Sequence, residues 1–522
     1  MRTRARRWGV GLAGVFALFL VHAYRIYGTD VALIDDAFIF FRYARHWAEG
    51  LGLVWNRGEP PVEGVSSLLY TALLALGVRL GWDVVVWATV LNGLLALASL
   101  GLVVALARHL LPEEVSPLWS VVPALLLALS PEFAFWAGAG MDSMLFLFLL
   151  LLSVWLMVEE RWGWAGVGFA LLGMTRLDSV PLFLFAWLLL GWREWKGGDK
   201  APLLRMGVGF IGLFLPFFLA RWVYFGWPLP NTFYAKMGGG WAAWREGIAY
   251  VLMFLRRPGI ALALILAAWG AWRGRTWPTI LVFGFIPLLL IRAILAGGDW
   301  MPHFRLLLPV LPFLYVMATY ALVSNPLLSS RWVGLVLVGG ILLGVVSPSL
   351  HVLRTRPWRL WRPVRLVEPM HASQYAMGLA LRDRLCPEDT VALLAVGAAA
   401  YLNDDHIIID MLGLNDVHIA HSPPVLHQGQ WDPGHVRLDV DYILRRSPEW
   451  IQLDTHLFDS PHFRPRDWMP VRRLWSDPRV RARYELVPLR VEVPTDYGRP
   501  RVGYIFFLHR KDAPTCDKGG RQ

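Results

Sequence analysis

The sequence predicts an α-helical multi-span membrane protein with a C-terminal α/β soluble domain, and two observations predict it. Of the 522 residues, 56% are hydrophobic and only 17% are charged, which is not the balance of a large soluble enzyme. Apolar runs long enough for membrane-spanning helices recur up to residue 350, and from residue 351 the composition becomes that of a soluble domain. We therefore expect a transmembrane domain over residues 1–350 and a soluble domain over residues 351–522.

The apolar runs predict about eleven spans, since a helix needs about 20 apolar residues to cross a bilayer. The runs near residues 162 and 258 are the shortest of them. Two further runs, 66–81 and 243–257, are short and amphipathic, and we expect their helices to lie along the membrane interface. The runs expected to cross are 8–27, 84–107, 118–136, 143–158, 162–174, 179–193, 203–225, 258–272, 277–296, 305–323 and 332–350.

The charges of the loops predict which side of the membrane each loop faces. Basic residues cluster at the N-terminus and recur in alternate loops, which marks those loops as cytoplasmic; examples are Arg108, Arg161, Arg193, Arg273 and Arg331. The intervening loops and everything after the last span then lie on the outer face of the cytoplasmic (inner) membrane. The net charge of +11 accompanies no Lys/Arg-rich tract or RNA-binding motif, so we expect membrane lipids and no nucleic acid as partners.

The C-terminal part contains two apolar segments, 391–396 and 407–410, that are typical of buried strands. A helix- or turn-like stretch separates them, which indicates an α/β unit. The only two cysteines, Cys386 and Cys516, also lie in this part. Outside the cytoplasm they could pair, but two thiols are weak evidence, and a pair of free thiols fits the sequence about as well.

The first outer stretch, residues 34–64, carries adjacent carboxylates at Asp35 and Asp36. Neighbouring side chains point in different directions, so the two are not expected to share a proton. We expect one of them to face a reaction site and to act as a general base toward a hydroxyl group. In a helix, Arg42 would lie about two turns beyond Asp35 on the same face and keep it ionised. The alternative is an ordinary solvated loop.

Three basic side chains on the outer loops have the chemistry of a phosphate site. Arg176, Lys236 and Arg305 each lie close to the end of a span, at the level of lipid phosphates. Arginine offers forked hydrogen bonds to phosphate oxygens, and lysine offers a point charge. The alternative is that each side chain only extends to the lipid headgroups. An acid or an amide stands near each of the three, and these are Asp178, Asn231 and Asp299.

Motifs on five outer loops and in the C-terminal part carry a further signal. They are Asp35-Asp36-Ala37-Phe38-Ile39, Arg42-Tyr43-Ala44, Gly50-Leu51-Gly52-Leu53-Val54, Asn56-Arg57-Gly58-Glu59, Val62-Glu63-Gly64, Gly140-Met141-Asp142-Ser143, Thr175-Arg176-Leu177-Asp178, Asn231-Thr232-Phe233-Tyr234-Ala235-Lys236, Gly297-Gly298-Asp299-Trp300-Met301-Pro302 and Asp410-Met411-Leu412-Gly413-Leu414-Asn415-Asp416. Together they resemble the membrane glycosyltransferases of the GT-C superfamily, most of all the family of the mycobacterial terminal arabinofuranosyltransferase. Four positions depart from that pattern: Asp142 and Asp178 stand where glutamate is expected, Leu177 replaces proline, and His46 replaces asparagine.

The resemblance implies a GT-C-like fold and a polyprenyl-phosphate sugar as donor, with arabinofuranose as the sugar it suggests. The acceptor would be an extracytoplasmic glycan or a lipid-anchored molecule of the cell envelope. Asp35 and Asp36 would be catalytic, and Arg176, Lys236 and Arg305 would bind the donor phosphate. No cofactor follows from the sequence; some GT-C enzymes use a divalent metal, which the acids could hold, but no ligand spacing argues for one. The residues expected to position the substrates are Arg42, Glu63, Asp142, Asp178, Asn231, Tyr234, Asp299 and His303.

A transporter or a flippase for lipid-linked sugars, without transferase activity, is the alternative function. Such a protein is expected to carry ionisable residues in the middle of its spans. Here the middles of the spans are nearly free of them, and His22 and Arg292 stand near span ends. The sequence therefore favours the transferase, without deciding whether it inverts or retains the anomeric carbon.

Overall fold

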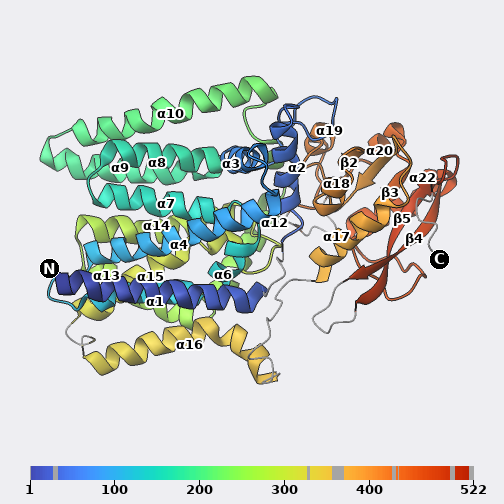
Figure 1. The fold of residues 1–522 in the computed structure, drawn as a ribbon. Coiled ribbons are helices and arrows are strands. Elements are labelled where there is room, and N and C mark those ends of the chain that lie inside the picture. Colours follow the sequence, from blue (N-terminus) through green and yellow to red (C-terminus); the bar gives the residue numbers. More distant parts are fainter. Residues whose placement is uncertain are drawn as a thin grey trace.

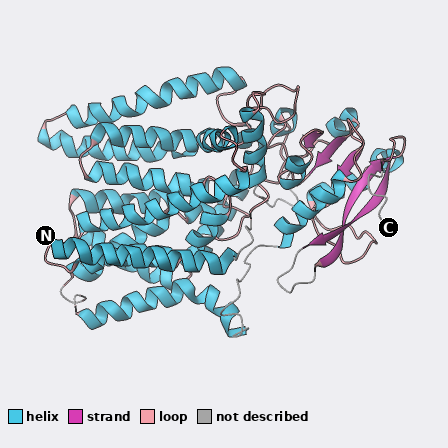
Figure 2. Ribbon diagram, viewed as in Figure 1, coloured by secondary structure: helices cyan, strands magenta, loops and turns pink. Residues whose placement is uncertain are grey.

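The computed structural model describes residues 2–27, 33–325, 328, 330–355, 369–425, 431, 432, 434–493 and 500–516. Long helices run side by side in a bundle, and the strands gather at one end of it (Figures 1 and 2). The bundle consists mainly of α1 (Arg2–Tyr27), α4 (Val84–Leu110), α5 (Val122–Ala128), α6 (Pro131–Gly138), α7 (Ser143–Val158), α8 (Trp162–Thr175), α9 (Val180–Gly197), α10 (Ala201–Phe225), α13 (Pro258–Arg273), α14 (Trp277–Leu295), α15 (Val310–Ser324) and α16 (Arg331–Thr355).

Each run that the sequence predicts to cross the membrane forms helix over most of its length. By length and composition alone, three of the described helices can cross a bilayer, and they are α4, α10 and α14. The count rises to five if each of two bent helix pairs forms one span. The chain is therefore a multi-pass membrane protein, while the number of eleven crossings and the domain boundary at residue 350 stay predictions.

Two helix pairs are sharply bent where they join. The axes of α5 and α6 differ by 64°, and those of α12 (Gly240–Leu255) and α13 differ by 91°. Pro131 and Pro258 begin the second helix of each pair, and proline suits this first position because its missing N–H has no partner there anyway. The segment 118–136 is thus not the single continuous helix that its apolar run predicts. α12 crosses the direction of α13, as a helix along the interface would.

Short helices connect the long ones. α3 begins after Ser67, whose Oγ accepts a hydrogen bond from the N–H of Tyr70. α2 begins directly after Asp36 and packs against α3 on one side and a helix of the C-terminal part on the other. These connecting elements are α2 (Ala37–Ala48), α3 (Leu68–Arg79), α11 (Asn231–Lys236) and the 3-10 turns η1 (Pro117–Val121), η2 (Leu177–Ser179) and η3 (Arg305–Leu307).

The C-terminal part contains a five-stranded mixed sheet in the order β2-β1-β3-β5-β4. β1 (Thr390–Leu393) pairs in parallel with both β2 (Ile407–Asp410) and β3 (Trp450–Gln452). β5 (Arg501–Arg510) pairs antiparallel with β3 and with β4 (Tyr484–Val493). The two predicted strands are confirmed, and both are apolar because parallel strands are covered on both faces. The helices of this part are α17 (Pro369–Arg382), α18 (Ala398–Leu402), α19 (Val417–His421), α20 (Val440–Arg446), α21 (Met469–Ser476) and α22 (Pro478–Arg483).

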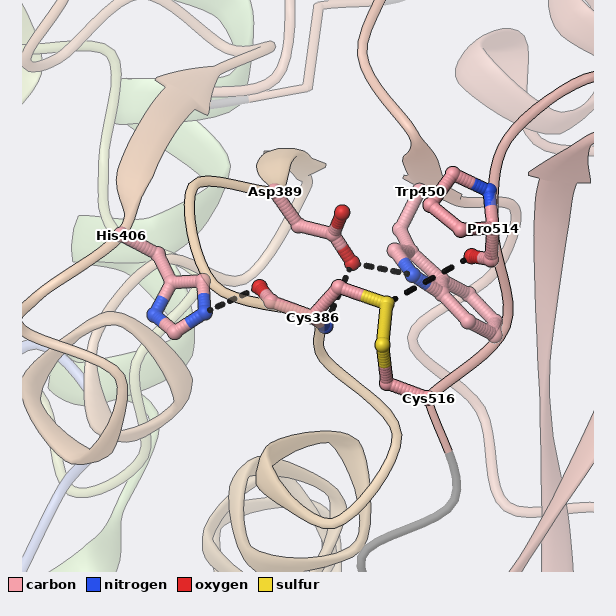
Figure 3. The surroundings of a disulfide bond; sticks show 6 residues. All are labelled: Cys386, Asp389, His406, Trp450, Pro514 and Cys516. Atoms are coloured by element: carbon pink, nitrogen blue, oxygen red, sulfur yellow. Dashed lines mark hydrogen bonds between the residues drawn. A yellow bond between two sulfur atoms is a disulfide. The ribbon is translucent and has the colours of Figure 1, made fainter.

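Cys386 and Cys516 form a disulfide bond, so the pairing that the sequence left open is present (Figure 3). The carboxylate of Asp389 accepts hydrogen bonds from the Cys386 N–H at 2.9 Å and from the Trp450 indole at 3.2 Å. The bond joins residues separated by 130 positions, and all five strands lie between them. It therefore ties the end of the described chain to the turn that precedes the sheet.

Candidate active site

Asp35 is buried and bound to the backbone of the C-terminal part. Its two carboxylate oxygens accept hydrogen bonds from the N–H of Gly397 at 3.0 Å and of Ala398 at 2.8 Å, at the start of α18. A side chain at Gly397 has no room, since its Cβ would overlap the Asp35 carbonyl oxygen. Burial raises the pKa of Asp35 to about 6. The hydrogen bond from Ala398 lowers this pKa, whereas the charge of Asp36 adds to the rise. Asp35 thus joins the bundle to the C-terminal part.

Arg42 also binds the C-terminal part, and the expectation that it pairs with Asp35 is wrong. Its Nε lies 3.4 Å from Asp404, and its guanidinium also donates to the carbonyl oxygen of Ala400. The physical reason is that α2 begins at Ala37, so Asp35 precedes the helix and does not share a helical face with Arg42. Burial alone would raise the pKa of Asp404; the hydrogen bond from His46 and the charge of Arg42 bring it below its ordinary value. Asp404 contacts four basic side chains of residues 34–64, namely Arg42, Arg45, His46 and Arg57.

Asn231 and Glu63 are also buried, and each has a partner on another element. The Asn231 side chain donates to the carbonyl oxygens of Gly413 at 2.8 Å and Leu414 at 3.0 Å. Glu63 forms a buried ion pair with Arg221 of α10, with Nε to Oε2 at 2.9 Å. Burial raises the pKa of Glu63, and Arg221 acts in the opposite direction. The sequence did not single out Arg221, although a charged residue inside an apolar run is a known signal.

The motif at residues 410–416 shapes the other side of this contact. Asp410 accepts hydrogen bonds from the N–H groups of Leu412 and Asn415 at 3.0 and 2.8 Å, which fixes the turn after β2. Gly64 packs so closely that a Cβ there would overlap Asn415 Oδ1. We call the contacts between residues 34–64 or Asn231 and residues 397–415 the seam. Most polar residues of the first outer motif belong to it.

Asp36 differs from its neighbour. Its side chain is half-buried, and among the residues that the structure describes its carboxylate has no hydrogen-bond or ion-pair partner. Lys236, at the end of α11, likewise has no such partner in the described part of the chain. The Lys236 side chain keeps exposed surface. The surrounding protein nevertheless lowers the pKa of Lys236 by desolvation, and the charge of Arg305 lowers it further. The charges of Asp36 and Asp299 raise this pKa and so oppose the change. The charges of Asp36 and Lys236 therefore act on each other.

Three arginine–aspartate pairs lie in the same region, since Asp142, Asp178 and Asp299 all act electrostatically on Arg176. Asp142 accepts a forked contact from Arg176 Nε and Nη2 at 2.8 and 2.9 Å. Asp299 accepts from Arg305 Nε at 2.8 Å, and Asp178 accepts from Arg292 Nε at 2.9 Å. Asp36, Arg176, Asp299 and Arg305 all act electrostatically on Lys236, so residues of four connecting segments converge. We call this set the charge cluster: Asp36, Asp142, Arg176, Asp178, Lys236, Arg292, Asp299 and Arg305. Arg292 is a member that the sequence assigned only to a span end.

Tyr234 and His303 lie in aromatic surroundings. The Tyr234 ring stands 4.4 Å from the ring of His421 in α19, and Trp227 packs against both. The His303 ring lies 4.5 Å from that of Phe135. Burial lowers the pKa of His303, so its imidazole favours the neutral form. The positioning roles that the resemblance suggests for these two residues stay predictions.

A divalent metal also stays a prediction. Within the described ranges, no group of three or more His, Cys, Asp or Glu side chains stands close enough to hold a metal ion. Both carboxylate oxygens of Asp142 accept from Arg176, and those of Asp35 accept from backbone N–H groups.

Comparisons with known proteins bear on the fold. Residues 364–497 match a family described as a domain of unknown function, DUF8728. No curated protein matches the sequence. Among solved structures, ArnT from Cupriavidus metallidurans bound to undecaprenyl phosphate matches with a TM-score of 0.55 and 13% identity, over 96% of this chain and 98% of that one. Mycobacterial arabinofuranosyltransferase AftD matches with a TM-score of 0.49 and 15% identity, over 97% of this chain and 40% of that one. The Archaeoglobus fulgidus oligosaccharyltransferase matches with a TM-score of 0.47 and 10% identity, over 76% of this chain and 62% of that one.

All three solved structures are of GT-C glycosyltransferases. Only the likeness to ArnT is close enough to support an argument, and at 13% identity it speaks for the fold alone. It extends over nearly the whole of both chains, so the bundle and the C-terminal part are arranged as in ArnT. The GT-C resemblance seen in the motifs is thereby confirmed at the level of the fold.

Proposed function

We propose that this protein is a GT-C glycosyltransferase that moves a sugar from a polyprenyl-phosphate donor to an extracytoplasmic glycan or cell-envelope acceptor. One observation carries the proposal: among the described residues, Asp36 and Lys236 are left without partners inside a cluster whose other charges are paired. A base and a phosphate-binding cation are the two groups that such a transfer requires. The fold shared with ArnT, solved with undecaprenyl phosphate bound, supports a lipid-phosphate donor.

Lys236 would bind the donor phosphate, with Arg305 and Arg176 beside it. Arg305 uses its Nε for Asp299, and Arg176 uses Nε and Nη2 for Asp142, so each guanidinium keeps further N–H groups for a phosphate oxygen. Cations fixed at the leaving group stabilise the charge that develops as it departs. The aspartates of the pairs hold the arginines in place before the donor arrives.

Asp36 would act as the general base. It accepts the proton of the acceptor hydroxyl while that oxygen attacks the anomeric carbon. The bond from the anomeric carbon to the phosphate oxygen breaks, and the polyprenyl phosphate leaves with the electron pair. A single displacement of this kind inverts the anomeric carbon. Asp35 would act indirectly, since its hydrogen bonds to Gly397 and Ala398 fix the chain on which Asp36 stands.

The reaction would take place on the outer face of the cytoplasmic membrane. The loops at the other end of the helices from the charge cluster are basic, which favours a cytoplasmic position for that end. The Cys386–Cys516 disulfide supports the same orientation, because structural disulfides persist in oxidising compartments. The soluble part would then cover the acceptor side of the charge cluster. Arabinofuranose is the sugar that the motifs suggest.

The test is transfer by purified protein in nanodiscs from a radiolabelled polyprenyl-phosphate arabinose to an envelope glycan extract. We expect labelled glycan and released polyprenyl phosphate from the wild type. A second arm places the protein in liposomes and follows movement of the intact labelled lipid between leaflets. Leaflet exchange without any release of polyprenyl phosphate would replace the proposal with the flippase alternative.

A further inference from the structure

A buried ion pair joins the two sharply bent helix pairs. Arg257, which precedes α13 at the 91° bend, donates to Glu132 in the first turn of α6, just after the 64° bend. The side chains are 3% exposed for Glu132 and 16% for Arg257. Glu132 Oε2 is buried and has no hydrogen-bond partner in the described part of the chain. A charged pair inside a membrane protein is expensive to bury and is therefore a candidate for a functional role.

The loop that carries Arg305 is strained beside this pair. His303 and Phe304 both adopt left-handed backbone angles, with φ of 56° and 45°. A non-glycine residue in this region is disfavoured by its Cβ and persists only where its surroundings hold it. Two consecutive residues of this kind, directly before Arg305, fix the direction in which its side chain leaves the loop.

The α6 helix and Arg257 hold the strained loop from two sides. Trp136 stands four residues after Glu132, on the same face of α6, and its indole donates to the His303 carbonyl oxygen at 3.1 Å. The guanidinium carbon of Arg305 lies 5.7 Å from the centre of the Trp136 ring. On the other side, Arg257 lies 5.9 Å from the centre of the Phe304 ring. Glu132 thus anchors the cation that supports Phe304.

We propose that the Glu132–Arg257 pair is a positioning device that sets Arg305 for the donor phosphate. This inference rests on the proposed function of the charge cluster. The pair clamps the two helix bends together, the clamp keeps Phe304 and His303 in their strained conformation, and that conformation directs Arg305 over Trp136 and toward Asp299. A purely structural pair would contribute to stability without affecting the affinity for the lipid phosphate.

The experiment measures binding of undecaprenyl phosphate to the full chain in nanodiscs, together with the melting temperature. Glu132→Gln keeps the shape but removes the charge that holds Arg257. We expect the dissociation constant to rise about tenfold, the size of one lost charge-assisted contact. The matched control is Asp454→Asn in the C-terminal part. The Asp454 carboxylate is also buried, and the substitution breaks its forked contact with Arg466. It should lower the melting temperature and leave the affinity unchanged.

A double variant, Glu132→Gln with Arg257→Gln, keeps the test decisive if the single variant unfolds. It leaves no unpaired buried charge, so its melting temperature should recover toward the wild-type value. The glutamine side chain that replaces Arg257 is too short to support Phe304, so the weakened affinity should remain. A double variant, or a folded single variant, that binds undecaprenyl phosphate as tightly as the wild type overturns the positioning role. A wild type that does not bind the lipid at all overturns the proposed function instead.

Discussion

Asp35 and Asp36 are neighbours in the sequence, yet they belong to different regions of the molecule. Asp35 is part of the seam, where its carboxylate is buried and bound by two backbone N–H groups. Asp36 is part of the charge cluster, where its carboxylate is half-buried and unpaired among the described residues. The comparison shows that one motif serves two purposes. Most polar residues of 34–64 contact the C-terminal part, and the Asp36 carboxylate is the one that we propose for the chemistry.

The largest expected effect is a loss of transfer activity when the charge cluster, and not the seam, is changed. Asp36→Asn removes the base without touching the seam, so transfer should fall by roughly 10²–10⁴-fold, the usual contribution of a general base. The melting temperature should stay within error of the wild type. The measurement is initial transfer rate with a polyprenyl-phosphate sugar. Wild-type transfer by this variant would remove Asp36 from the chemistry.

The second largest effect is expected on stability, when the fully buried Arg42 is removed from the seam. Arg42→Ala removes a buried partner of Asp404 and the donor to two carbonyl oxygens of the C-terminal part, those of Ala400 and His406. We expect a loss of roughly 3–5 kcal/mol in the stability of the docked C-terminal part. Limited proteolysis in nanodiscs measures it, with exposed Arg490→Ala on β4 as the control. Unchanged protection of residues 369–516 would contradict the seam.

Lys236 should affect donor binding more than folding. Lys236→Ala removes the cation of the charge cluster that has no partner among the described residues, and the Michaelis constant for the donor should rise by about tenfold or more. Lys236→Arg keeps the charge and should recover part of the affinity. The same constant for Lys236→Ala and the wild type would place the phosphate elsewhere.

The smallest effect concerns pH. Burial raises the pKa of Asp35 to about 6 from an ordinary 3.8, so the folded state binds its proton more tightly than the unfolded state does. The stability that Asp35 contributes is therefore full below pH 3.8 and is lost as the pH rises through about 6. Between these values the melting temperature of the wild type should decline relative to that of Asp35→Asn. Parallel curves for the two proteins would contradict the shift.

The sequence predicted the fold well where the signal is local. The long apolar runs up to residue 350 form helices, and the two short apolar segments 391–396 and 407–410 contain most of β1 and all of β2. The missed feature is the bend inside 118–136, although Ser130 and Pro131 mark it once the rule for prolines at helix starts is applied.

The site was predicted less completely, because its partners are distant in the chain. Arg42 binds Ala400 across 358 positions, and no periodicity in either segment indicates that contact. The same holds for the pairs of Glu63 with Arg221 and of Glu132 with Arg257, separated by 158 and 125 positions. The charged residues inside or beside apolar runs were visible, but which acid each one meets is a property of helix packing.

The most direct test of the account is a structure of the protein in nanodiscs with undecaprenyl phosphate bound. The account predicts the phosphate at the charge cluster, in hydrogen-bond contact with Lys236 and Arg305, with Asp36 facing the side from which an acceptor would enter. A phosphate bound at the seam, or on the bundle surface away from Lys236, would contradict it.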